Sequence, residues 1–333
     1  MRNLLTFLCG LLIAVSIKAQ DPHFSQFFAS PLTLNPALTG KFDGDLRLAA
    51  NHRDQWLSIP NAFITTSVSA DFGIMKKEIP KGDIFGLGIS YLSDQSGDGA
   101  LNLNYGSLSL SYHKALDEEG YNTIGAGFQA TYSSLNLNLQ NLKFEDQLTQ
   151  NGFTGPTAET FPNGLDKNYF DMAAGLLFSG SSDGVNNYYF GASLYHINRP
   201  QVGFQDQNWI LLPRTTVHGG CSFPLTDQLT INGSAITQFQ NQANETVIGA
   251  ALSANVNQDK DNPTNVYIGS WIRFGDAIIP YIGLEFTGLR IGASYDINTS
   301  SLKAATDGEG GTELSLIYIK KDYGQRGIPC PTF

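Results

Sequence analysis

From residue 45 onward, the chain is a succession of segments in which apolar and polar residues alternate. In FDMAAGLLFSG, for example, Met172, Ala174 and Leu176 share one face. LTINGSAITQFQ and GLRIGASYDIN repeat the same period of two. A period of two is typical of β-strands, because successive side chains of a strand point to opposite faces. The pattern therefore predicts an all-β protein.

The alternation predicts fourteen strands. Most of them have about ten residues or more, whereas strands of globular proteins usually have ~5–6. A tilted strand needs ~9–11 residues to span a bilayer. The predicted strands are 45–51, 61–73, 82–92, 101–113, 121–137, 168–179, 186–197, 214–223, 228–238, 245–256, 263–273, 277–286, 288–297 and 311–320.

The lengths of the links between these strands give a second indication. Links 138–167, 198–213 and 298–310 are the longest, and all of them follow odd-numbered strands. Links 224–227 and Thr287 follow even-numbered strands and are among the shortest. Bacterial outer-membrane barrels have short periplasmic turns and longer outer loops. The links thus favour a single transmembrane antiparallel β-barrel of about fourteen strands over a soluble sandwich.

Two local features of the strands carry further predictions. The apolar residues of LNLNYGSLSLSYH change face near Gly106, which predicts a β-bulge there. Aromatic residues near strand ends are expected to form girdles at the membrane interfaces. The residues expected in these girdles are Tyr188, Tyr189, Tyr195, Trp271, Phe274, Tyr281, Phe286 and Tyr318.

The first nineteen residues resemble a cleaved signal peptide, with Arg2 before the apolar stretch 4–17 and Ala19 as the last residue removed. Cleavage leaves 18 basic against 30 acidic residues, a net charge of −12. An acidic exported chain is a poor nucleic-acid binder. Cys221 and Cys330 remain, and they could form a disulfide if both face the periplasm. Two cysteines do not make a structural zinc site.

Candidate sites for catalysis and metals are weak. HRDQW places His52 and Asp54 on one face of a strand and Arg53 on the other, and no nucleophile motif accompanies them. DKDNPTN, residues 259–265, resembles a calcium loop but lacks the glycine and glutamate of an EF-hand. We therefore expect no enzyme activity, no cofactor and no metal.

The stretch DPHFSQFFASPLTLNPALTG lies between the signal peptide and the first strand. Its three prolines exclude a long helix, and its aromatic residues need an apolar surface to pack on. We expect the segment 20–44 to fold into or against the periplasmic end of the barrel. It could act there as a structural seal or as a docking segment for a partner.

This stretch resembles the N-terminal signature of the PorP/SprF family, D-P-x-F-S-Q-F-x-x-x-P-L-x-x-N-P-A-x-x-G. HRDQW (52–56) resembles the family's Y-R-x-Q-W, with His52 in the place of tyrosine. SYD (294–296) and CPTF (330–333) resemble two further family features. The residues that match the signature are Asp21, Pro22, Phe24, Ser25, Gln26, Phe27, Pro31, Leu32, Asn35, Pro36, Ala37 and Gly40.

The resemblance implies a non-enzymatic barrel in the cell outer membrane, part of the type IX secretion system of Bacteroidota and its gliding machinery. Its implied partners are outer-membrane lipid, a secreted sorting-domain protein such as an adhesin, and other periplasmic or outer-membrane secretion components. The expected organisation is a signal peptide (1–19), a periplasmic segment (20–44), the barrel (45–320) and a periplasmic tail (321–333). A channel for small solutes is the alternative. Candidate docking residues are Phe24, Gln26, Phe27, Asn35, Pro36, Arg53, Gln55 and Trp56.

Overall fold

The structure is a computed structural model. It describes residues 21–56, 58–59, 62–74, 79–160, 165–204, 207–257, 263–301 and 303–320. The predicted signal peptide and the predicted C-terminal tail lie outside these ranges.

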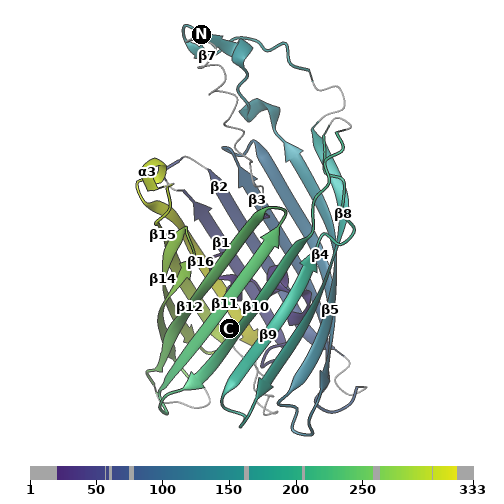
Figure 1. Ribbon diagram of the computed structural model, residues 1–333, viewed down its shortest axis with the longest axis vertical. Helices are drawn as coiled ribbons and strands as arrows, with labels where there is room; N and C mark the ends of the chain where they lie inside the picture. Colours follow the sequence, from purple (N-terminus) through teal and green to yellow (C-terminus); the bar gives the residue numbers. More distant parts are fainter. Residues whose placement is uncertain are drawn as a thin grey trace, which may run out of the picture.

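Fourteen antiparallel strands close into one barrel, as the alternation predicts (Figure 1). Each strand pairs with its neighbours along the chain, and β1 pairs with β16 to close the circle. The strands are nine to sixteen residues long. They are β1 (Leu46–Gln55), β2 (Phe63–Ile74), β3 (Ile84–Ser96), β4 (Leu101–Ala115), β5 (Thr123–Leu137), β8 (Asp166–Ser181), β9 (Asn187–Tyr195), β10 (Arg214–Pro224), β11 (Leu229–Gln240), β12 (Ala243–Asn255), β13 (Asn265–Arg273), β14 (Ala277–Phe286), β15 (Leu289–Asn298) and β16 (Glu309–Lys320).

The two ends of the barrel differ in the length of their links. The three longest links, which follow β5, β9 and β15, all lie at one end, which we call the long-loop end. The first of these links holds the small hairpin β6 (Leu148–Thr149) and β7 (Gly152–Phe153), which projects beyond the barrel (Figure 1). The third holds α3 (Lys303–Thr306). At the opposite, short-turn end, β1 begins, β16 ends, and two residues join β14 to β15.

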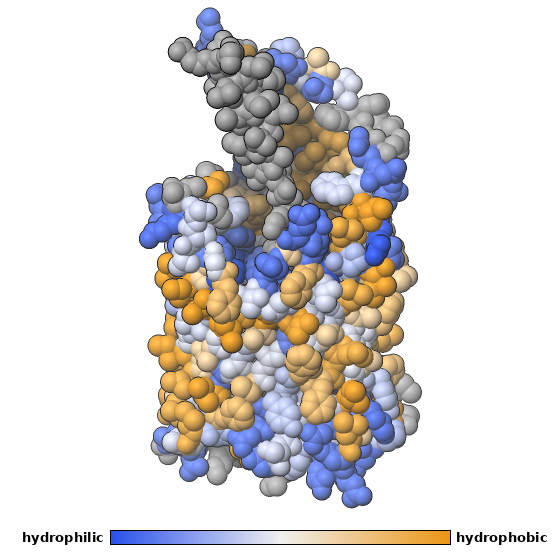
Figure 2. Space-filling view, in the orientation of Figure 1, coloured by the Kyte–Doolittle hydropathy of each residue, from blue (hydrophilic) through white to orange (hydrophobic). Residues whose placement is uncertain are grey.

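The outer face of the barrel is apolar over a broad band (Figure 2). Outward-facing side chains such as Leu108, Phe128, Leu176 and Ile268 are among its exposed large apolar residues. Such a surface suits contact with lipid hydrocarbon. In the described ranges, the structure has no helix that is long and apolar enough to cross a membrane.

The predicted bulge near Gly106 is wrong. β4 keeps one unbroken register with β3 and with β5 through Gly106. The apolar residues change face because the outward positions Asn102 and Asn104 lie near the long-loop end, above the apolar band, while Leu103 and Tyr105 point inward. The register shift that the structure does show lies between β15 and β16, where Ile297 pairs with Glu309 and Gly310 is skipped.

The girdle prediction is wrong for four of its eight aromatic residues. Tyr189, Tyr195, Trp271 and Tyr281 are buried inside the barrel. Their side chains lie on the inward face because the lumen is filled with a partly apolar segment that they pack against. Tyr188, Phe274 and Tyr318 are exposed, and Phe286 is half-buried.

The lumen is filled by residues 21–44, which we call the plug. Three single turns of helix shape it: η1 (Phe27–Ala29), α2 (Pro31–Leu34) and η2 (Pro36–Leu38). Proline opens α2 and η2, where its missing N–H costs no hydrogen bond. The Asn35 side chain accepts a hydrogen bond from the N–H of Ala37 and so caps η2. Short turns separated by prolines explain why the segment has no strand or helix period.

Candidate functional site

The plug runs along the lumen from the long-loop end to the short-turn end. Its first residue, Asp21, contacts Gln240 and His196, which lie at the long-loop ends of β11 and β9. Its later residue Gly40 contacts Asp71, which lies near the short-turn end of β2. The plug therefore reaches well beyond one mouth of the barrel. The segment predicted to fold into or against one end of the barrel lies inside it along its length, and the compartment that each end faces stays a prediction.

At the long-loop end, two wall carboxylates bind the plug through its backbone and a hydroxyl. Glu313 of β16 accepts hydrogen bonds from the backbone N–H groups of Ser25, at 2.7 Å, and Gln26, at 2.9 Å. Asp296 of β15 accepts one from the Ser25 hydroxyl at 2.8 Å. Charge-assisted hydrogen bonds of this kind are about twice as strong as neutral ones. They fix the plug backbone against the last two strands.

Two arginines balance these carboxylates. Arg53 of β1 donates to Asp296 at 2.9 Å and to the backbone carbonyl of His23 at 2.6 Å. Arg273 of β13 donates to Asp296 at 2.8 Å and to the Ser25 hydroxyl at 2.6 Å. Both arginine side chains are almost fully buried. Buried charges need such partners, because an isolated charge in a low-dielectric interior is costly.

Gln26 adds a neutral contact next to this network. Its amide group donates to the backbone carbonyl of Glu313 at 2.9 Å and to the Ser294 hydroxyl at 3.0 Å. Its carbonyl oxygen accepts from the Ser315 hydroxyl at 2.6 Å. The side chain is 1% exposed, so these bonds satisfy an amide that would otherwise be costly to bury.

Asp21 forms a second charged contact on the other side of the lumen. Its carboxylate lies 2.6 Å from Nε2 of His196, and His196 in turn lies 2.9 Å from Asp171. Burial opposes the charge of Asp21, but Arg214 and His196 outweigh it and hold the pKa of Asp21 well below its usual range. Burial also disfavours the charge of His196, yet Asp21 and Asp171 raise the pKa of His196 to about 9. The imidazole is therefore charged at neutral pH and anchors the start of the plug.

The middle of the plug packs on an apolar wall. Phe28 lies with its ring centroid 5.0 Å from Trp271 and 5.6 Å from Tyr281, the latter edge to face. Phe27, Ala29 and Leu34 belong to the same buried cluster as these side chains. Aromatic pairs of this geometry contribute ~0.5–1.5 kcal/mol beyond the area they bury. The apolar wall explains why the lumen carries inward-facing aromatic residues.

Beyond this wall, the plug backbone lies directly on glycines of the barrel. A side chain at Gly127 would clash with Pro36 and Ala37, and one at Gly175 would clash with Asn35. Asn35 is 0% exposed, and its amide donates to the Leu176 carbonyl at 3.0 Å and lies 3.0 Å from Nε2 of His218. Glycine is required at Gly127 because the two backbones approach more closely than any Cβ allows, and at Gly175 because the Asn35 side chain occupies the place of a Cβ.

The plug ends in a turn that is tied to the short-turn end of the wall. Gly40 adopts φ +68 and lies so close to Gly86 that a Cβ would stand 2.6 Å from its Cα. The Gly40 N–H donates to Asp71 at 2.7 Å, and Arg47 donates to the same carboxylate at 2.7 Å. The Ser111 hydroxyl donates to the Thr39 carbonyl at 2.6 Å. These hydrogen bonds fix the turn through which the chain leaves the lumen and enters β1.

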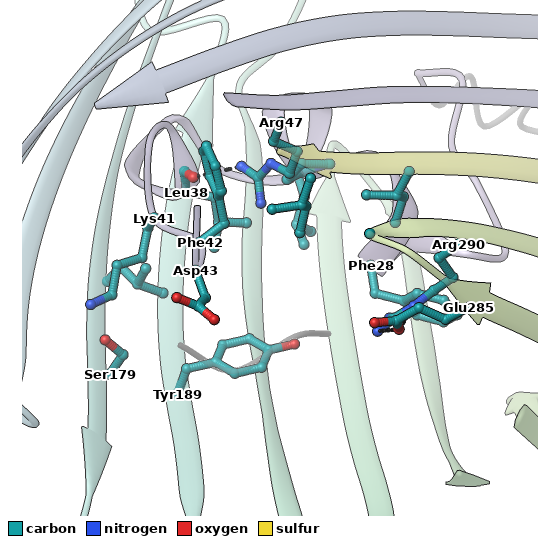
Figure 3. Close-up of a pocket in the computed structure, with 16 residues that line it drawn as sticks. Phe28, Leu38, Lys41, Phe42, Asp43, Arg47, Ser179, Tyr189, Glu285 and Arg290 are labelled. Atoms are coloured by element: carbon teal, nitrogen blue, oxygen red, sulfur yellow. Dashed lines mark hydrogen bonds and ion pairs between the residues drawn. The ribbon is translucent and has the colours of Figure 1, made fainter. Parts of the chain in front are cut away.

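A cavity of about 70 Å³, which we call the vestibule, lies between the plug and the wall toward the short-turn end (Figure 3). Phe28, Leu38 and Tyr189 face it, together with the charged residues Lys41 and Asp43 (Figure 3). Its complete lining is Phe28, Pro31, Leu34, Leu38, Lys41, Phe42, Asp43, Arg47, Leu177, Ser179, Tyr189, Glu285, Gly288, Arg290, Ile317 and Ile319.

The structure brings together six of the eight docking candidates. Phe24, Gln26, Phe27, Asn35, Pro36 and Arg53 are all buried between the plug and the wall. The other two lie at the rim of the long-loop end: Gln55 ends β1, and Trp56 has φ +60 and packs edge to face on Phe63. Burial of the six favours the seal over a docking surface, and their role toward a partner stays a prediction.

Several wall residues of this site do not stand out in the sequence. Asp296 falls in the SYD motif, but Glu313, Arg273, His196 and Asp71 belong to no motif. A signal does exist, because a charged residue on the inward face of a long strand must have a partner inside the lumen. In β1, the predicted faces are confirmed: Arg53 points inward and is buried, and His52 is exposed. The strand extends to Gln55, beyond the predicted end at residue 51.

The remaining candidate sites can be placed in part. In the part of the chain that the structure describes, no three histidine, cysteine, aspartate or glutamate residues are grouped so that they could hold a metal ion. Most of the calcium-like loop 259–265 lies outside the described residues. Cys221 is a free cysteine on the outward face of β10, and Cys330 lies outside the described residues.

Solved structures of low sequence similarity share the fold. The toluene transporter TbuX of Ralstonia pickettii has 12% identity and a TM-score of 0.52, over 89% of this chain and 94% of that chain. The monoaromatic hydrocarbon channel CymD has 10% identity and a TM-score of 0.48, over 89% and 94%. The KdgM porin has 9% identity and a TM-score of 0.39, over 82% and 98%. At these identities the likeness shows the fold alone.

The family comparison is more specific. No curated protein matches the chain. A family model, described as type IX secretion system membrane protein PorP/SprF, matches residues 16–318. This match spans the plug and almost all of the barrel. The chain therefore belongs to the PorP/SprF family of type IX secretion system membrane proteins and is a β-barrel of the outer membrane.

Proposed function

We propose that this barrel supports the export of sorting-domain proteins, such as adhesins, or their attachment to the cell surface, and that it does so without enzymatic activity. The observation that carries the proposal is the family match over residues 16–318. We further propose that the short-turn end faces the periplasm and the long-loop end faces outward, as is usual for bacterial barrels.

The filled lumen supports a role in holding partners rather than in passing solutes. Between them, Ser25, Gln26 and Asn35 bind β8, β15 and β16 from inside the barrel. A rigid, filled barrel offers its loops and its two ends as surfaces for partners. The long links after β5 and β9 carry exposed apolar residues, among them Phe153 and Trp209, that suit such contacts.

Deletion of the gene tests the proposal. We expect one or more sorting-domain proteins to disappear from the cell surface, while permeability to small solutes stays unchanged. The measurement is quantitative mass spectrometry of the surface and secreted fractions, with a strain that carries a restored copy as the control. Unaltered surface and secreted proteomes would contradict the proposal.

The role of the plug can be tested separately. Phe24 and Phe27 are 5% and 4% exposed, so changing both to alanine removes packing from the seal. Loss of barrel assembly in this variant supports a structural seal. Normal assembly with loss of cargo display supports a docking role for the segment. Heat-dependent gel mobility reports assembly, and surface labelling of the cargo reports display.

A channel for small solutes is the alternative, and the likeness in fold to the transporter TbuX is the observation that favours it. The purified protein would then show a steady conductance in a planar bilayer. We expect no such conductance, because the plug contacts the wall throughout the length of the lumen. A variant that lacks residues 21–38 serves as the positive control for an open pore.

A further inference from the structure

We propose that the vestibule is a binding site for residues 321–333 of this same chain, which follow β16 directly. This inference is independent of the secretion role, since it concerns which segment occupies this cavity. Residues 321–333 lie outside the described residues, whereas the cavity and the strand that leads to it are described.

The chemistry of the vestibule calls for an apolar occupant. Leu34, Leu38 and Phe42 line it from the plug, while Leu177 and Ile317 line it from the wall. The side chains of Leu34 and Leu177 are buried, so the cavity continues the core that the plug makes with the barrel. A concave apolar surface that opens to water gains free energy when a second apolar segment covers it.

The position of β16 selects the occupant. Ile317 and Ile319, two of the last four residues of this strand, themselves line the vestibule. Lys320 closes the strand, and its carbonyl accepts a hydrogen bond from Asp45 at 2.8 Å, at the exit of the plug. The described part of the chain therefore ends at the edge of the cavity. A segment tethered this closely has an effective concentration on the order of mM, which a separate partner rarely reaches.

The composition of the segment fits the lining. KDYGQRGIPCPTF offers Tyr323, Ile328 and Phe333 as apolar side chains, and its two prolines favour an extended chain. The lining carries charges of both signs, with Lys41 and Asp43 on the plug side (Figure 3). The segment likewise carries both signs, with Asp322 and Arg326. Thirteen extended residues reach ~40 Å, which is ample to cross the lumen.

Cysteine cross-linking tests this site, because the segment contains a native cysteine. In a Cys221→Ser background, Ser179→Cys places a thiol of nearly equal size in the vestibule wall. A disulfide with Cys330 forms only where the two Cα atoms come within ~7 Å. The matched control is Thr226→Cys in the exposed turn between β10 and β11, at the same end of the barrel.

We expect an intramolecular disulfide between Cys330 and residue 179, at a yield at least ~5-fold above that of the Thr226→Cys control. Non-reducing gels and mass spectrometry of the linked peptide measure it in the full-length protein. Equal yields at both positions, or no link at residue 179, would overturn the proposal. Cross-linked dimers would overturn it too, because the occupant would then be a second copy.

Alkylation gives a second readout. In a Cys221→Ser, Ser179→Cys, Cys330→Ser background, removal of residues 321–333 should speed maleimide labelling of residue 179 by ~10-fold, because covered groups react only when the cover leaves. Where the shortened chain does not fold, Ile328→Asp in the full-length chain replaces it. An unchanged labelling rate would mean that a different molecule, or nothing, covers the vestibule.

Discussion

At the long-loop end, the plug meets the barrel mainly through charged side chains, whereas farther along the lumen Pro36 and Ala37 lie against bare backbone. Ser25 and Gln26 are held by Glu313 and Asp296, with Arg53 beside them. Pro36 and Ala37 instead rest on Gly127. The first contact depends on the balance of charge, and the second depends on the absence of side chains. Two kinds of interaction therefore hold the plug, and different substitutions disrupt them.

The two kinds of contact between plug and wall should respond differently to substitution. A charge network loses stability when one member is removed, because the remaining charges stay buried without a partner. A glycine contact loses stability when any side chain is added, because packed backbones have no room to move. Substitutions in the charge network and at the glycines can therefore distinguish the two kinds of contact.

Arg53→Ala should have the largest effect. Asp296 would keep Arg273, but Glu313 would lose the charge of its nearest guanidinium, at 3.9 Å, and the His23 carbonyl would lose a donor. Breaking a buried charge pair costs ~3–5 kcal/mol. We expect a loss of that size in the free energy of unfolding, measured by urea titration with gel mobility as the readout.

The control for this variant is Lys303→Ala in α3, which removes an exposed charge at the same end of the barrel. It should be close to neutral. Adding Glu313→Gln to Arg53→Ala should recover part of the loss, because it removes the carboxylate that Arg53→Ala leaves without its guanidinium. A loss below about 1 kcal/mol for Arg53→Ala alone would mean that the network is not what holds this half of the plug.

Gly127→Ala should destabilise the other half by ~1–3 kcal/mol, because its Cβ would overlap the backbone of Pro36 and Ala37. Limited proteolysis should cut the plug faster, and the urea midpoint should fall. Gly106→Ala is the matched control, since no atom lies within 4 Å of its added Cβ. Equal behaviour of the two variants would show that close backbone approach does not matter here.

Ser111→Ala removes the hydroxyl that donates to the Thr39 carbonyl at 2.6 Å. The loss of one buried hydrogen bond costs ~0.5–1.5 kcal/mol. We expect a small rise in the proteolysis of the plug near Thr39. Ser107→Ala, on the same face of β4, removes a bond to Thr131 of the wall and should leave plug proteolysis unchanged.

The Asp21 contact should also depend on pH. Because the pKa of His196 is raised to about 9, its charge stabilises the folded state fully below its ordinary value of 6.5. This contribution is lost as the pH rises through about 9. We expect the start of the plug to become more sensitive to protease between pH 7 and pH 10. His196→Gln should abolish the change, and an unaltered slope would contradict the assignment.

The fold could be predicted from the sequence, because a period of two over long segments leaves few alternatives. All fourteen strands appear where they are predicted, within a few residues. The lumen could not be predicted in the same way. Alternation tells which residues share a face, but it does not tell which face meets lipid. From the sequence, Trp271 and Tyr281 fit the membrane interface as well as the lumen; the structure shows that both pack against Phe28 of the plug.

The charge network could be predicted only in part. Arg53 could be identified as a candidate from the sequence, because it belongs to the HRDQW motif and lies on the strand face opposite His52 and Asp54. Glu313 lies far from Arg53 in the sequence. Its partners in the plug are backbone N–H groups, which nearly every residue type has, so the sequence does not reveal them. The glycine contacts could not be predicted either. The sequence does not distinguish Gly127, which lies against the plug, from Gly106, which does not.

The contact between the plug and the closing strands has a consequence for folding kinetics. Ser25 is synthesised early, yet Glu313, the acceptor of its backbone hydrogen bond, lies 288 residues later in the chain. Interactions of such high contact order form slowly, because a long loop must be closed before they contribute. Arg53 and Glu313 pair with each other where β1 meets β16, and both also bind the plug. We therefore expect the pairing of β1 with β16 and the docking of the plug to be coupled during folding, because an open barrel lacks the complete binding site for the plug.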